Sequence, residues 1–284
     1  MRTLNGAVAV VTGAGSGIGR AVASALAARG CALALADIDE EGLAGTRAAL
    51  DGARVTTQRV DVSKLDEMTA FRDRVERDFG RVSLLVNNAG VALYGKIEDV
   101  SIADLEWILG INFWGAVYGA KLFAPLLLRE PEANIVTISS LFGLIAPPLQ
   151  GGYCASKFAV RGFFEVLRHE LAHTNVRVTV VHPGGVKTQI SARARRGERA
   201  DAERFRSDTQ AFERALVTPP PVAAERIVAG ILADAPRVLI GRDAYLLDLI
   251  QRFFPARYMS PIGPLLDPRK RFSISKPAPA AKRA

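Results

Sequence analysis

Cysteine and histidine are scarce in this chain of 284 residues, which has two of the first and three of the second. Cys31 and Cys154 are too few for a disulfide framework and lack metal-ligand spacing, so we expect a reducing, cytoplasmic setting and no metal site. No apolar run approaches the roughly 18 residues that a membrane span needs. The first such run, residues 7–11, is too short to predict a signal peptide.

Acidic residues are in the minority, and the formal net charge is +8. Basic residues are concentrated in residues 193–206, which also contain acidic residues, and in the stretches 268–272 and 276–284. No basic helix interleaved with aromatic residues occurs, so nucleic acid is not an expected partner. A solvated surface is the favoured interpretation of the charge, although an anionic membrane could also be attracted to it.

What the sequence has in abundance is an alternation of short apolar runs with helical patterns. The predicted strands span residues 7–12, 32–37, 54–60, 82–87, 133–139, 176–182 and 237–240. The predicted helices span residues 17–30, 40–50, 64–79, 101–129, 152–174, 222–234 and 243–254. The strands are almost continuously apolar, as in parallel sheets covered on both faces. We therefore predict an α/β fold with a doubly wound, parallel sheet of about seven strands flanked by helices.

No linker divides the chain, so we predict a single catalytic domain over residues 1–242. Within it, residues 189–217 do not fit the alternation and are predicted to form an arginine-rich helical insert that acts as a substrate lid. Residues 243–284 then form an extension, which consists of an amphipathic helix and a basic, proline-rich tail.

The segment TGAGSGIGR, residues 12–20, joins the first strand to the first helix. Gly13 permits a tight turn, Gly17 lets the backbone approach a pyrophosphate, and Gly19 lets the helix pack closely on the strand. The N–H groups at the start of the helix would then face the phosphates. Between a strand and a helix, this spacing predicts a Rossmann-like dinucleotide site. A glycine-rich loop without a ligand is the alternative.

The second strand ends in Asp37. A carboxylate at this place accepts hydrogen bonds from the adenosine ribose hydroxyls and repels a 2′-phosphate. Because Ile38 and Asp39 follow instead of an arginine, we predict that the cofactor is NAD rather than NADP. The alternative is that Asp37 caps the next helix.

Seven short motifs occur in order along the chain: TGAGSGIG (12–19), DV (61–62), NNAG (87–90), Asn112, ISS (138–140), YCASK (153–157) and PGGVKT (183–188). Together they resemble the compact type of the short-chain dehydrogenase/reductase family over about residues 5–241. The resemblance implies an oxidoreductase that acts on CH–OH groups. The cofactor contacts that it implies are Gly13, Ser16, Gly17, Ile18, Gly19, Asp37, Asp61, Val62, Asn88, Ala89, Gly90, Tyr153, Lys157, Pro183, Gly184, Val186 and Thr188.

The same resemblance assigns catalysis to Asn112, Ser140, Tyr153 and Lys157, with Ser140 chosen over Ser139 by its spacing from the tyrosine. Tyr153 and Lys157 stand four residues apart and share a helix face, so the ammonium is expected to lower the pKa of the phenol. Tyr153 would then be the general base in alcohol oxidation and the general acid in ketone reduction. Ser140 would donate to the substrate oxygen, and Asn112 would relay protons through water. Taken alone, the tyrosine–lysine pair could equally be a surface pair.

Open α/β sheets bind ligands beyond the carboxyl ends of their strands, so we expect pocket walls from residues 91–97, 141–152 and 187–215. The first two segments are apolar or aromatic before Lys96, which favours a hydrophobic secondary alcohol or ketone as substrate. The predicted substrate contacts are Leu93, Leu141, Phe142, Leu149, Tyr153 and Gly185. Gly185 stands where the family usually has another residue, a departure expected to loosen the loop that follows.

Two other functions stay open at this point. A carrier- or CoA-linked ketoacyl reductase fits the positive charge, because arginines of the insert could meet an acidic substrate tail. That class usually requires NADPH, which disagrees with Asp37. A non-catalytic nucleotide-sensing protein is the other alternative, and the complete set of four catalytic residues disfavours it.

Family members commonly form dimers or tetramers through the helices that correspond to residues 101–129 and 152–174, so the resemblance implies a homo-oligomer. The helix at 243–254 carries apolar side chains that need a cover: Leu246, Leu247, Leu249, Ile250, Phe253 and Phe254. A contact within the chain or between subunits is the simpler expectation. Peripheral attachment to a membrane, assisted by the basic tail, is the alternative.

Overall fold

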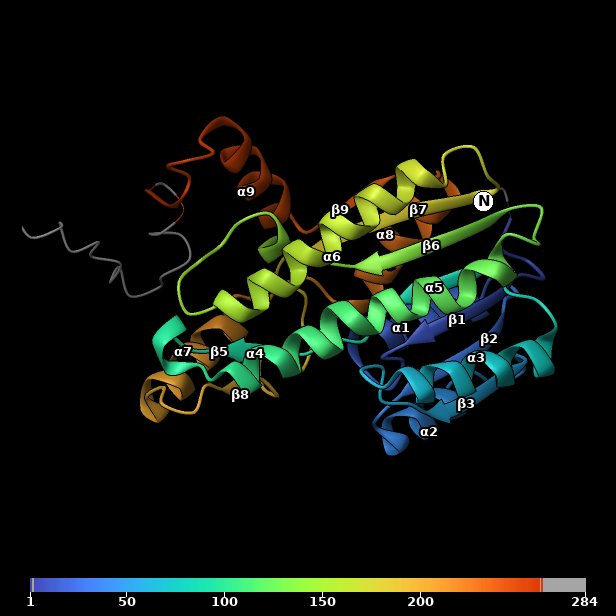
Figure 1. The fold of residues 1–284 in the computed structure, drawn as a ribbon, viewed down its shortest axis with the longest axis horizontal. Coiled ribbons are helices and arrows are strands. Elements are labelled where there is room, and N and C mark those ends of the chain that lie inside the picture. Colours follow the sequence, from blue (N-terminus) through green and yellow to red (C-terminus); the bar gives the residue numbers. More distant parts are fainter. Residues whose placement is uncertain (2, 261, 263–284) are drawn as a thin grey trace, which may run out of the picture.

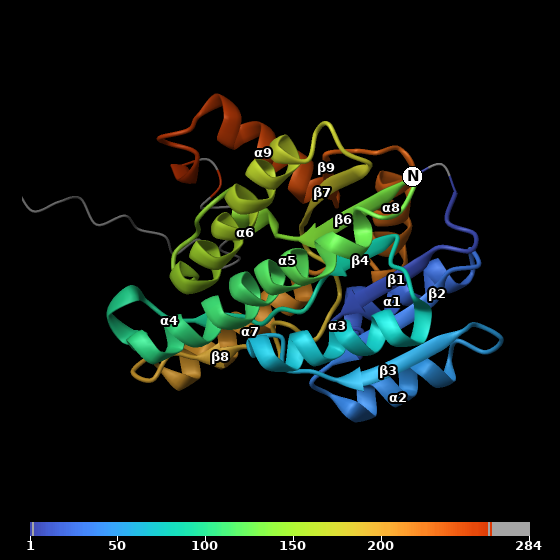
Figure 2. The same cartoon turned by 45° about the vertical axis from the view of Figure 1, so that its right-hand side comes forward.

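The computed structural model describes residues 1, 3–260 and 262, in which seven strands form one parallel sheet in the order β3-β2-β1-β4-β6-β7-β9. The strands are β1 (Val8–Thr12), β2 (Ala32–Asp37), β3 (Val55–Arg59), β4 (Leu84–Asn87), β6 (Ala133–Ile138), β7 (Val176–Pro183) and β9 (Arg237–Ile240). Each predicted strand falls on one of them. The predicted fold class, a doubly wound parallel sheet flanked by helices, is thereby confirmed (Figures 1 and 2).

Helices cover both faces of the sheet (Figure 1). On one face lie α1 (Gly17–Ala27), α2 (Glu40–Ala48) and α8 (Pro220–Leu232), and on the other lie α3 (Leu65–Phe79), α5 (Gly115–Leu127) and α6 (Gly151–Glu170). Successive strand residues point to opposite faces, so Ala9 and Val11 enter the first core and Val10 enters the second. This two-sided burial explains why the strands read as unbroken apolar runs.

The predicted helix 101–129 is one helical run with an interruption. It consists of α4 (Ile102–Leu109), a π-helical segment at Gly110–Trp114, and α5. Asn112 lies in the π segment and is buried, with its side chain bonded to the backbone of Val91. Such π segments often occur at functional sites, because the wider turn redirects one side chain.

Two short strands were not predicted. β5 (Leu93–Tyr94) pairs in parallel with β8 (Arg195–Arg196), and each has only two residues, too few to show a period. β8 and α7 (Ala202–Ala215) together form most of the arginine-rich insert. Both lie with α4 at the end of the molecule where the strands of the sheet finish (Figure 1).

The helix α9 (Arg242–Phe253) follows β9 and begins one residue before the predicted extension. Its Asp248 carboxylate accepts from Arg237 of β9 at 3.0 Å and from Arg252 at 3.1 Å. Its Leu247 packs against Leu141 and neighbouring apolar residues, which supplies part of the expected cover within the chain. The expectation for the tail at 263–284 lies outside the described residues.

Over residues 1, 3–260 and 262, no helix combines the length and the apolar character needed to cross a membrane.

Candidate active site

The turn after β1 is built so that only glycine fits at three places. Gly13 and Gly17 have φ angles of 66° and 55°, in the left-handed region that side chains rarely adopt. A Cβ at Gly13 would stand 2.7 Å from the Cα of Ala89, and one at Gly19 would stand 2.1 Å from the carbonyl oxygen of Gly13. The turn is therefore a shallow backbone cradle without a side chain at these three positions, as close approach of a pyrophosphate requires.

Helix α1 starts at this cradle with unpaired N–H groups. Ser16, its N-cap residue, makes no side-chain capping bond, and the first turn has no acidic residue. Asn88 fixes the turn by donating from Nδ2 to the carbonyl oxygens of Thr12 and Gly13, both at 3.0 Å. A helix start with free donors beside a fixed glycine turn suits a phosphate group.

Asp37 ends β2 beside the same cradle. Its Oδ2 accepts from the N–H of Gly15 at 2.7 Å, and its Oδ1 accepts from the N–H of Asp39 at 3.0 Å. The alternative that Asp37 caps the next helix is wrong, because Asp39 is the cap and accepts from the N–H of Gly42. Asp37 thus remains at the cavity wall, where it can meet a ribose.

Ser140, Tyr153 and Lys157 converge at the carboxyl end of β6. Ser140 stands two residues after the end of the strand, and its hydroxyl is hydrogen-bonded to the phenol of Tyr153. Lys157 lies one turn further along α6, with Nζ 5.8 Å from the centre of the Tyr153 ring. Ser139 instead points inward and donates to the carbonyl oxygen of Lys157 at 2.9 Å. The choice of Ser140 over Ser139 agrees with this geometry.

Burial dominates the electrostatics of this group. It raises the pKa of Tyr153 to about 12, against the lowering effect of the hydrogen bond from Ser140. It also lowers the pKa of Lys157 to about 8. We expected Lys157 to lower the phenol pKa, and in this structure it does not, since its Nζ is turned to the carbonyl oxygen of Ile138 at 3.0 Å.

Asn112 sits behind the cluster rather than in the cavity wall. Its Oδ1 accepts from the N–H of Val91 at 2.8 Å, while its Nδ2 donates to the carbonyl oxygen of Val91 and to the hydroxyl of Ser156. Ser156 in turn donates to the carbonyl oxygen of Tyr153. Asn112 thereby ties the loop after β4 to the first turn of α6.

His182 contacts the backbone of Ser140 from the interior of the protein, a role that its sequence position did not reveal. The imidazole is fully buried, with Nδ1 at 3.0 Å from the carbonyl oxygen of Ser140. Burial lowers the pKa of His182 to about 4, so the ring is neutral at neutral pH. A neutral ring can donate from Nδ1 and so hold the backbone that carries the serine.

A cavity of about 1220 Å³ runs over the strand ends and joins these features. Of the predicted catalytic and cofactor residues, all but Gly19 and Asn112 line it, and both of these lie directly behind its wall. Every predicted substrate contact lines it as well: Leu93, Leu141, Phe142, Leu149, Tyr153 and Gly185.

The insert closes one side of this cavity with aromatic contacts. Phe142 packs edge-on against Tyr153, with ring centres 6.1 Å apart, and Phe212 of α7 lies 6.3 Å from Phe142. Tyr94 packs against Phe205 and donates from its hydroxyl to Asp208 at 2.6 Å. The wall is less apolar than its first two segments indicated, because α7, which lies in the third expected segment, adds charged groups such as Glu203, Arg204 and Asp208.

Three of the seven arginines of the insert form ion pairs with acids. Arg193 meets Asp39 at 3.4 Å, and Arg204 meets Asp208 at 3.5 Å. A third pair joins Arg195 to Asp104 at 3.3 Å, and the Arg195 guanidinium also stacks over the ring of Trp107. The Arg193 and Arg195 pairs hold the insert to the body of the protein, whereas the Arg204 pair lies within α7.

Asp243 of α9 is a site residue that sequence reasoning missed. Its Oδ2 accepts from the N–H of Gly185 at 2.6 Å, and a Cβ at Gly184 would stand 2.2 Å from that oxygen. The predicted loosening of the loop at Gly185 is therefore countered by this tether. The sequence could not predict this contact, because Asp243 and Gly185 are some sixty residues apart and only the fold brings them together.

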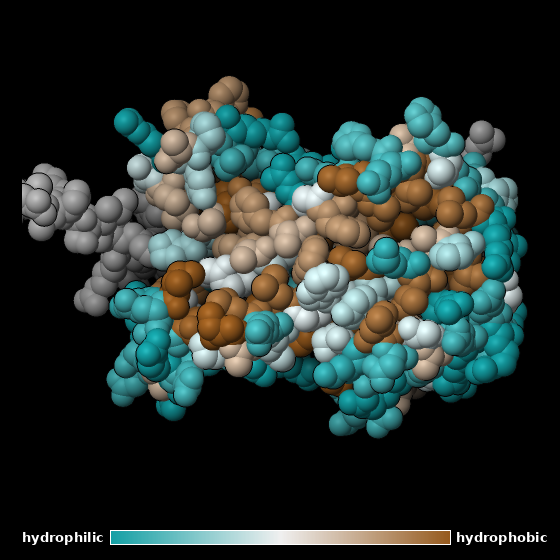
Figure 3. Space-filling model, viewed as in Figure 1, coloured by the Kyte–Doolittle hydropathy of each residue, from teal (hydrophilic) through white to brown (hydrophobic). Residues whose placement is uncertain are grey.

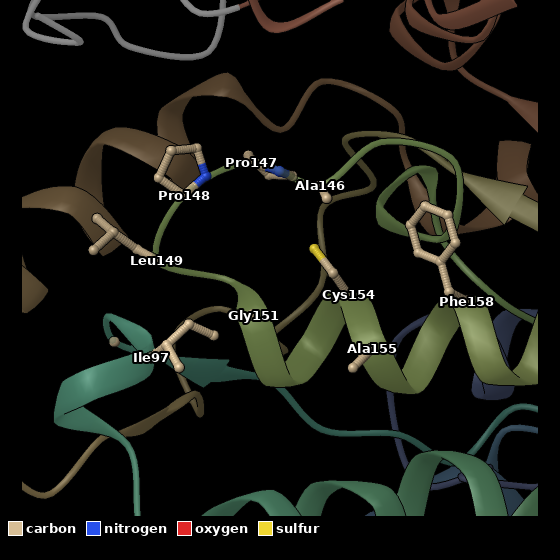
Figure 4. Close-up of a pocket in the computed structure, with 10 residues that line it drawn as sticks. Ile97, Ala146, Pro147, Pro148, Leu149, Gly151, Cys154, Ala155 and Phe158 are labelled. Atoms are coloured by element: carbon tan, nitrogen blue, oxygen red, sulfur yellow. The ribbon is translucent and has the colours of Figure 1, made fainter. Parts of the chain in front are cut away.

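A second, smaller cavity of about 480 Å³ lies beside the first turn of α6 (Figure 4). The segment Pro147–Leu149 lines both cavities and so separates them. Cys154 lines the smaller one, and burial raises the pKa of its thiol to about 12. A thiol that stays protonated is a poor nucleophile, which agrees with the interpretation of Cys154 as a small helix residue.

The fold and the site define a class: an open α/β protein with a dinucleotide cradle beside a half-buried serine–tyrosine pair. Comparison with known proteins makes this specific. The chain matches the family described as short chain dehydrogenase over residues 7–199, and it belongs to that family. The protein is therefore an oxidoreductase that acts on CH–OH groups and uses a nicotinamide dinucleotide as its cofactor.

Three similar proteins illustrate the relationship. SadH of Mycobacterium tuberculosis, which carries the provisional name of an oxidoreductase, is 43% identical over 91% of this chain and 94% of its own. D-threitol dehydrogenase of Mycolicibacterium smegmatis is 35% identical over 84% and 91%. A short-chain dehydrogenase/reductase from Burkholderia phymatum, solved in complex with NAD, is 33% identical over 90% and 96%, with a TM-score of 0.82.

Proposed function

We propose that this chain is an NAD-dependent oxidoreductase that interconverts a hydrophobic secondary alcohol and its ketone, with Tyr153 as the proton-transfer group. The observation that carries the proposal is the hydrogen-bonded Ser140–Tyr153 pair, which lies between the glycine cradle and the apolar walls of one cavity. This juxtaposition puts a proton donor and acceptor where a substrate carbon could face a dinucleotide.

The cofactor preference rests on Asp37. Its carboxylate is held by two backbone N–H groups at the edge of the cradle, where a ribose 2′-phosphate would meet negative charge. The nearby Arg20 guanidinium is engaged by Thr46 and by the carbonyl oxygens of Gly15 and Gly42. NAD therefore fits this end of the cavity better than NADP.

The chain's own residues move the proton. A dinucleotide held in this cavity would supply the hydride acceptor for alcohol oxidation and the hydride donor for ketone reduction. In oxidation, the phenolate oxygen of Tyr153 takes the proton of the substrate hydroxyl, and in reduction the phenol gives a proton to the substrate oxygen. Ser140 donates a hydrogen bond to the substrate oxygen and stabilises the charge that develops there.

Lys157 and Asn112 act behind the tyrosine. The ammonium of Lys157 stands 5.8 Å from the centre of the phenol ring, and a turn of Nζ away from the carbonyl oxygen of Ile138 would let it favour the phenolate as the proton leaves. It is also placed to hydrogen-bond the ribose next to the nicotinamide. Asn112 positions the turn of α6 that carries the tyrosine, and a water held by its side chain would complete a proton relay to Lys157.

The substrate is proposed to be hydrophobic because the walls next to Tyr153 are apolar or aromatic, notably Leu93, Leu141 and Phe142. A panel of secondary alcohols read by NADH formation tests this. Aryl, long-chain and steroid-like alcohols should turn over with the highest kcat/KM. A preference for small charged hydroxy acids, or for a polyol such as the threitol named for one relative, would contradict the proposed substrate class.

The carrier-linked ketoacyl reductase has less support. Arg193 and Arg204, which line the cavity, each have an acidic partner, so they offer an acidic substrate tail little unpaired charge. Asp37 also disfavours the NADPH that this class usually requires. A nucleotide-sensing protein without activity would not need the Ser140–Tyr153 pair. Detection of alcohol-dependent NADH formation would exclude this alternative.

We further propose that the chain forms a homodimer or homotetramer through α5 and α6. Large apolar side chains are exposed on α6, among them Phe158 and Val166, and Trp114 is exposed directly before α5. Figure 3 shows apolar atoms in a band across the face where these two helices lie. Sedimentation analysis should give a multiple of the monomer mass, and Val166→Asp should reduce it.

The proposed setting is the reducing cytoplasm. Cys31 and Cys154, the two cysteines of the chain, are buried and unpaired. Burial raises the pKa of the Cys31 thiol to about 11, so both thiols stay protonated and inert.

A further inference from the structure

One face of α9 is apolar and exposed. Tyr245, Leu246, Leu249 and Phe253 are 56, 51, 53 and 72% exposed, and Phe254 directly after the helix is 57% exposed. The opposite face is buried, with Ala244, Leu247 and Asp248 packed on the body of the protein. Brown and tan atoms gather over this helix in the space-filling view (Figure 3). The helix is thus fixed in place on one side and unpartnered on the other within the described residues.

Positive charge is concentrated in the same part of the chain. Residues 242–284 have nine basic and three acidic side chains, a net charge of +6 out of +8 for the whole protein. The first 241 residues, nearly six times as many, have a net charge of only +2. Arg257 lies exposed just after the apolar face, and Arg252 stands beside that face with its side chain 60% exposed, although it also pairs with Asp248.

The apolar face also reaches the mouth of the active-site cavity. Leu246 lines that cavity although half of its surface is exposed, and Leu247 lines it from the buried side. One turn earlier, Asp243 bonds to the backbone of Gly185. The exposed apolar surface is therefore continuous with the entrance of an apolar pocket.

We propose that α9 docks on an anionic lipid surface and turns the entrance of the cavity toward it. An amphipathic helix with apolar groups on one face and arginines beside them binds such a surface in the plane of the headgroups. The cations of residues 242–284 add electrostatic attraction. A second copy of the chain would be a poor cover, because the contact would bring two segments of net charge +6 together. Docking is independent of the proposed reaction, because it needs no turnover.

Vesicle co-sedimentation of the full chain tests this proposal. The probes are phosphatidylcholine vesicles and vesicles with about one third phosphatidylglycerol, each at low and at high salt. We expect the wild type to bind the anionic vesicles at least about tenfold more tightly than the neutral ones, and to lose that difference at high salt. Circular dichroism and thermal unfolding confirm that each variant is folded.

Two variants separate the apolar and the electrostatic contributions. The double variant L249S/F253S should bind anionic vesicles at least about tenfold more weakly, because it loses two apolar side chains that would enter the lipid surface. Both side chains are exposed, so their loss should leave the fold intact. The triple variant R269Q/K270Q/R271Q should also bind at least about tenfold more weakly. Ile102→Ser, which removes an equally exposed apolar side chain from α4, should bind like the wild type.

Three outcomes would overturn the proposal. The first is the absence of wild-type binding to anionic vesicles, and the second is equal binding to neutral and anionic ones. The third is that L249S/F253S leaves vesicle binding unchanged but lowers the oligomer mass in sedimentation, which would make α9 a subunit contact. NADH formation, measured separately without vesicles, tests the proposed reaction and is unaffected by any of these results.

Discussion

Replacing Asp37 by asparagine should remove most of the discrimination against NADP. The carboxylate lies at the cavity wall and cannot move away, because Gly15 and Asp39 hold both of its oxygens. Two unit charges about 4 Å apart cost roughly 4 kcal/mol at an effective dielectric of about 20. If salt screening halves this, about 2 kcal/mol remains, or roughly thirtyfold in kcat/KM.

The assay is the ratio of kcat/KM for the two cofactors with one alcohol, since a ratio is insensitive to partly inactive protein. The wild type should favour NAD by at least about thirtyfold, and Asp37→Asn should reduce that preference to within about threefold. Glu41→Gln removes an exposed acid from the first turn of α2, outside the cavity wall, and should leave the ratio unchanged. A wild type that uses NADP equally well, or an Asp37→Asn variant with an unaltered ratio, would refute the reasoning.

Three further predictions concern the rest of the site. Ser140→Ala should lower kcat by about 10²–10³, as loss of an oxyanion donor does, whereas Ser139→Ala should mainly lower thermal stability; equal effects on kcat would contradict the assignment. Asp243→Ala should raise KM for the cofactor about tenfold by releasing the loop at Gly185, and Asp243→Asn should restore most of it, because an amide oxygen can still accept that bond. Burial raises the pKa of Tyr153 to about 12, so the phenol is protonated at neutral pH. Alcohol oxidation, which needs the phenolate, should therefore accelerate from about pH 7 to about pH 9, while ketone reduction, which needs the phenol, stays level; an oxidation rate that falls over this range argues against a tyrosine base.

The seven strands were predictable because parallel strands covered on both faces read as continuous apolar runs bounded by loops. The two-residue strands β5 and β8 were not, since a period cannot be seen in two residues. The π segment was also hidden, because the sequence around Asn112 has the apolar pattern of an uninterrupted helix. The position of the π segment depends on the hydrogen bond that the Val91 N–H donates to Asn112, and only the fold brings these two residues together.

The residues of the site likewise fall into those that the sequence could predict and those that it could not. The glycine turn and Asp37 were predictable because their backbone geometry and charge are requirements of local chemistry. Asp243 and His182 were not, because each supports a loop that is distant in sequence. The direction of the Lys157 ammonium is a third such case, since its contact with Ile138 depends on how α6 packs on β6.

The central claim is that Tyr153 transfers the proton in a reaction coupled to NAD, and Tyr153→Phe tests it most directly. Fluorescence titration with NADH and turnover of a hydrophobic secondary alcohol should be measured on the same sample. We predict a Kd for NADH close to that of the wild type and a kcat lower by about 10²–10⁴, because the ring remains in place and only the hydroxyl is lost. Near-normal turnover in this variant would contradict the account.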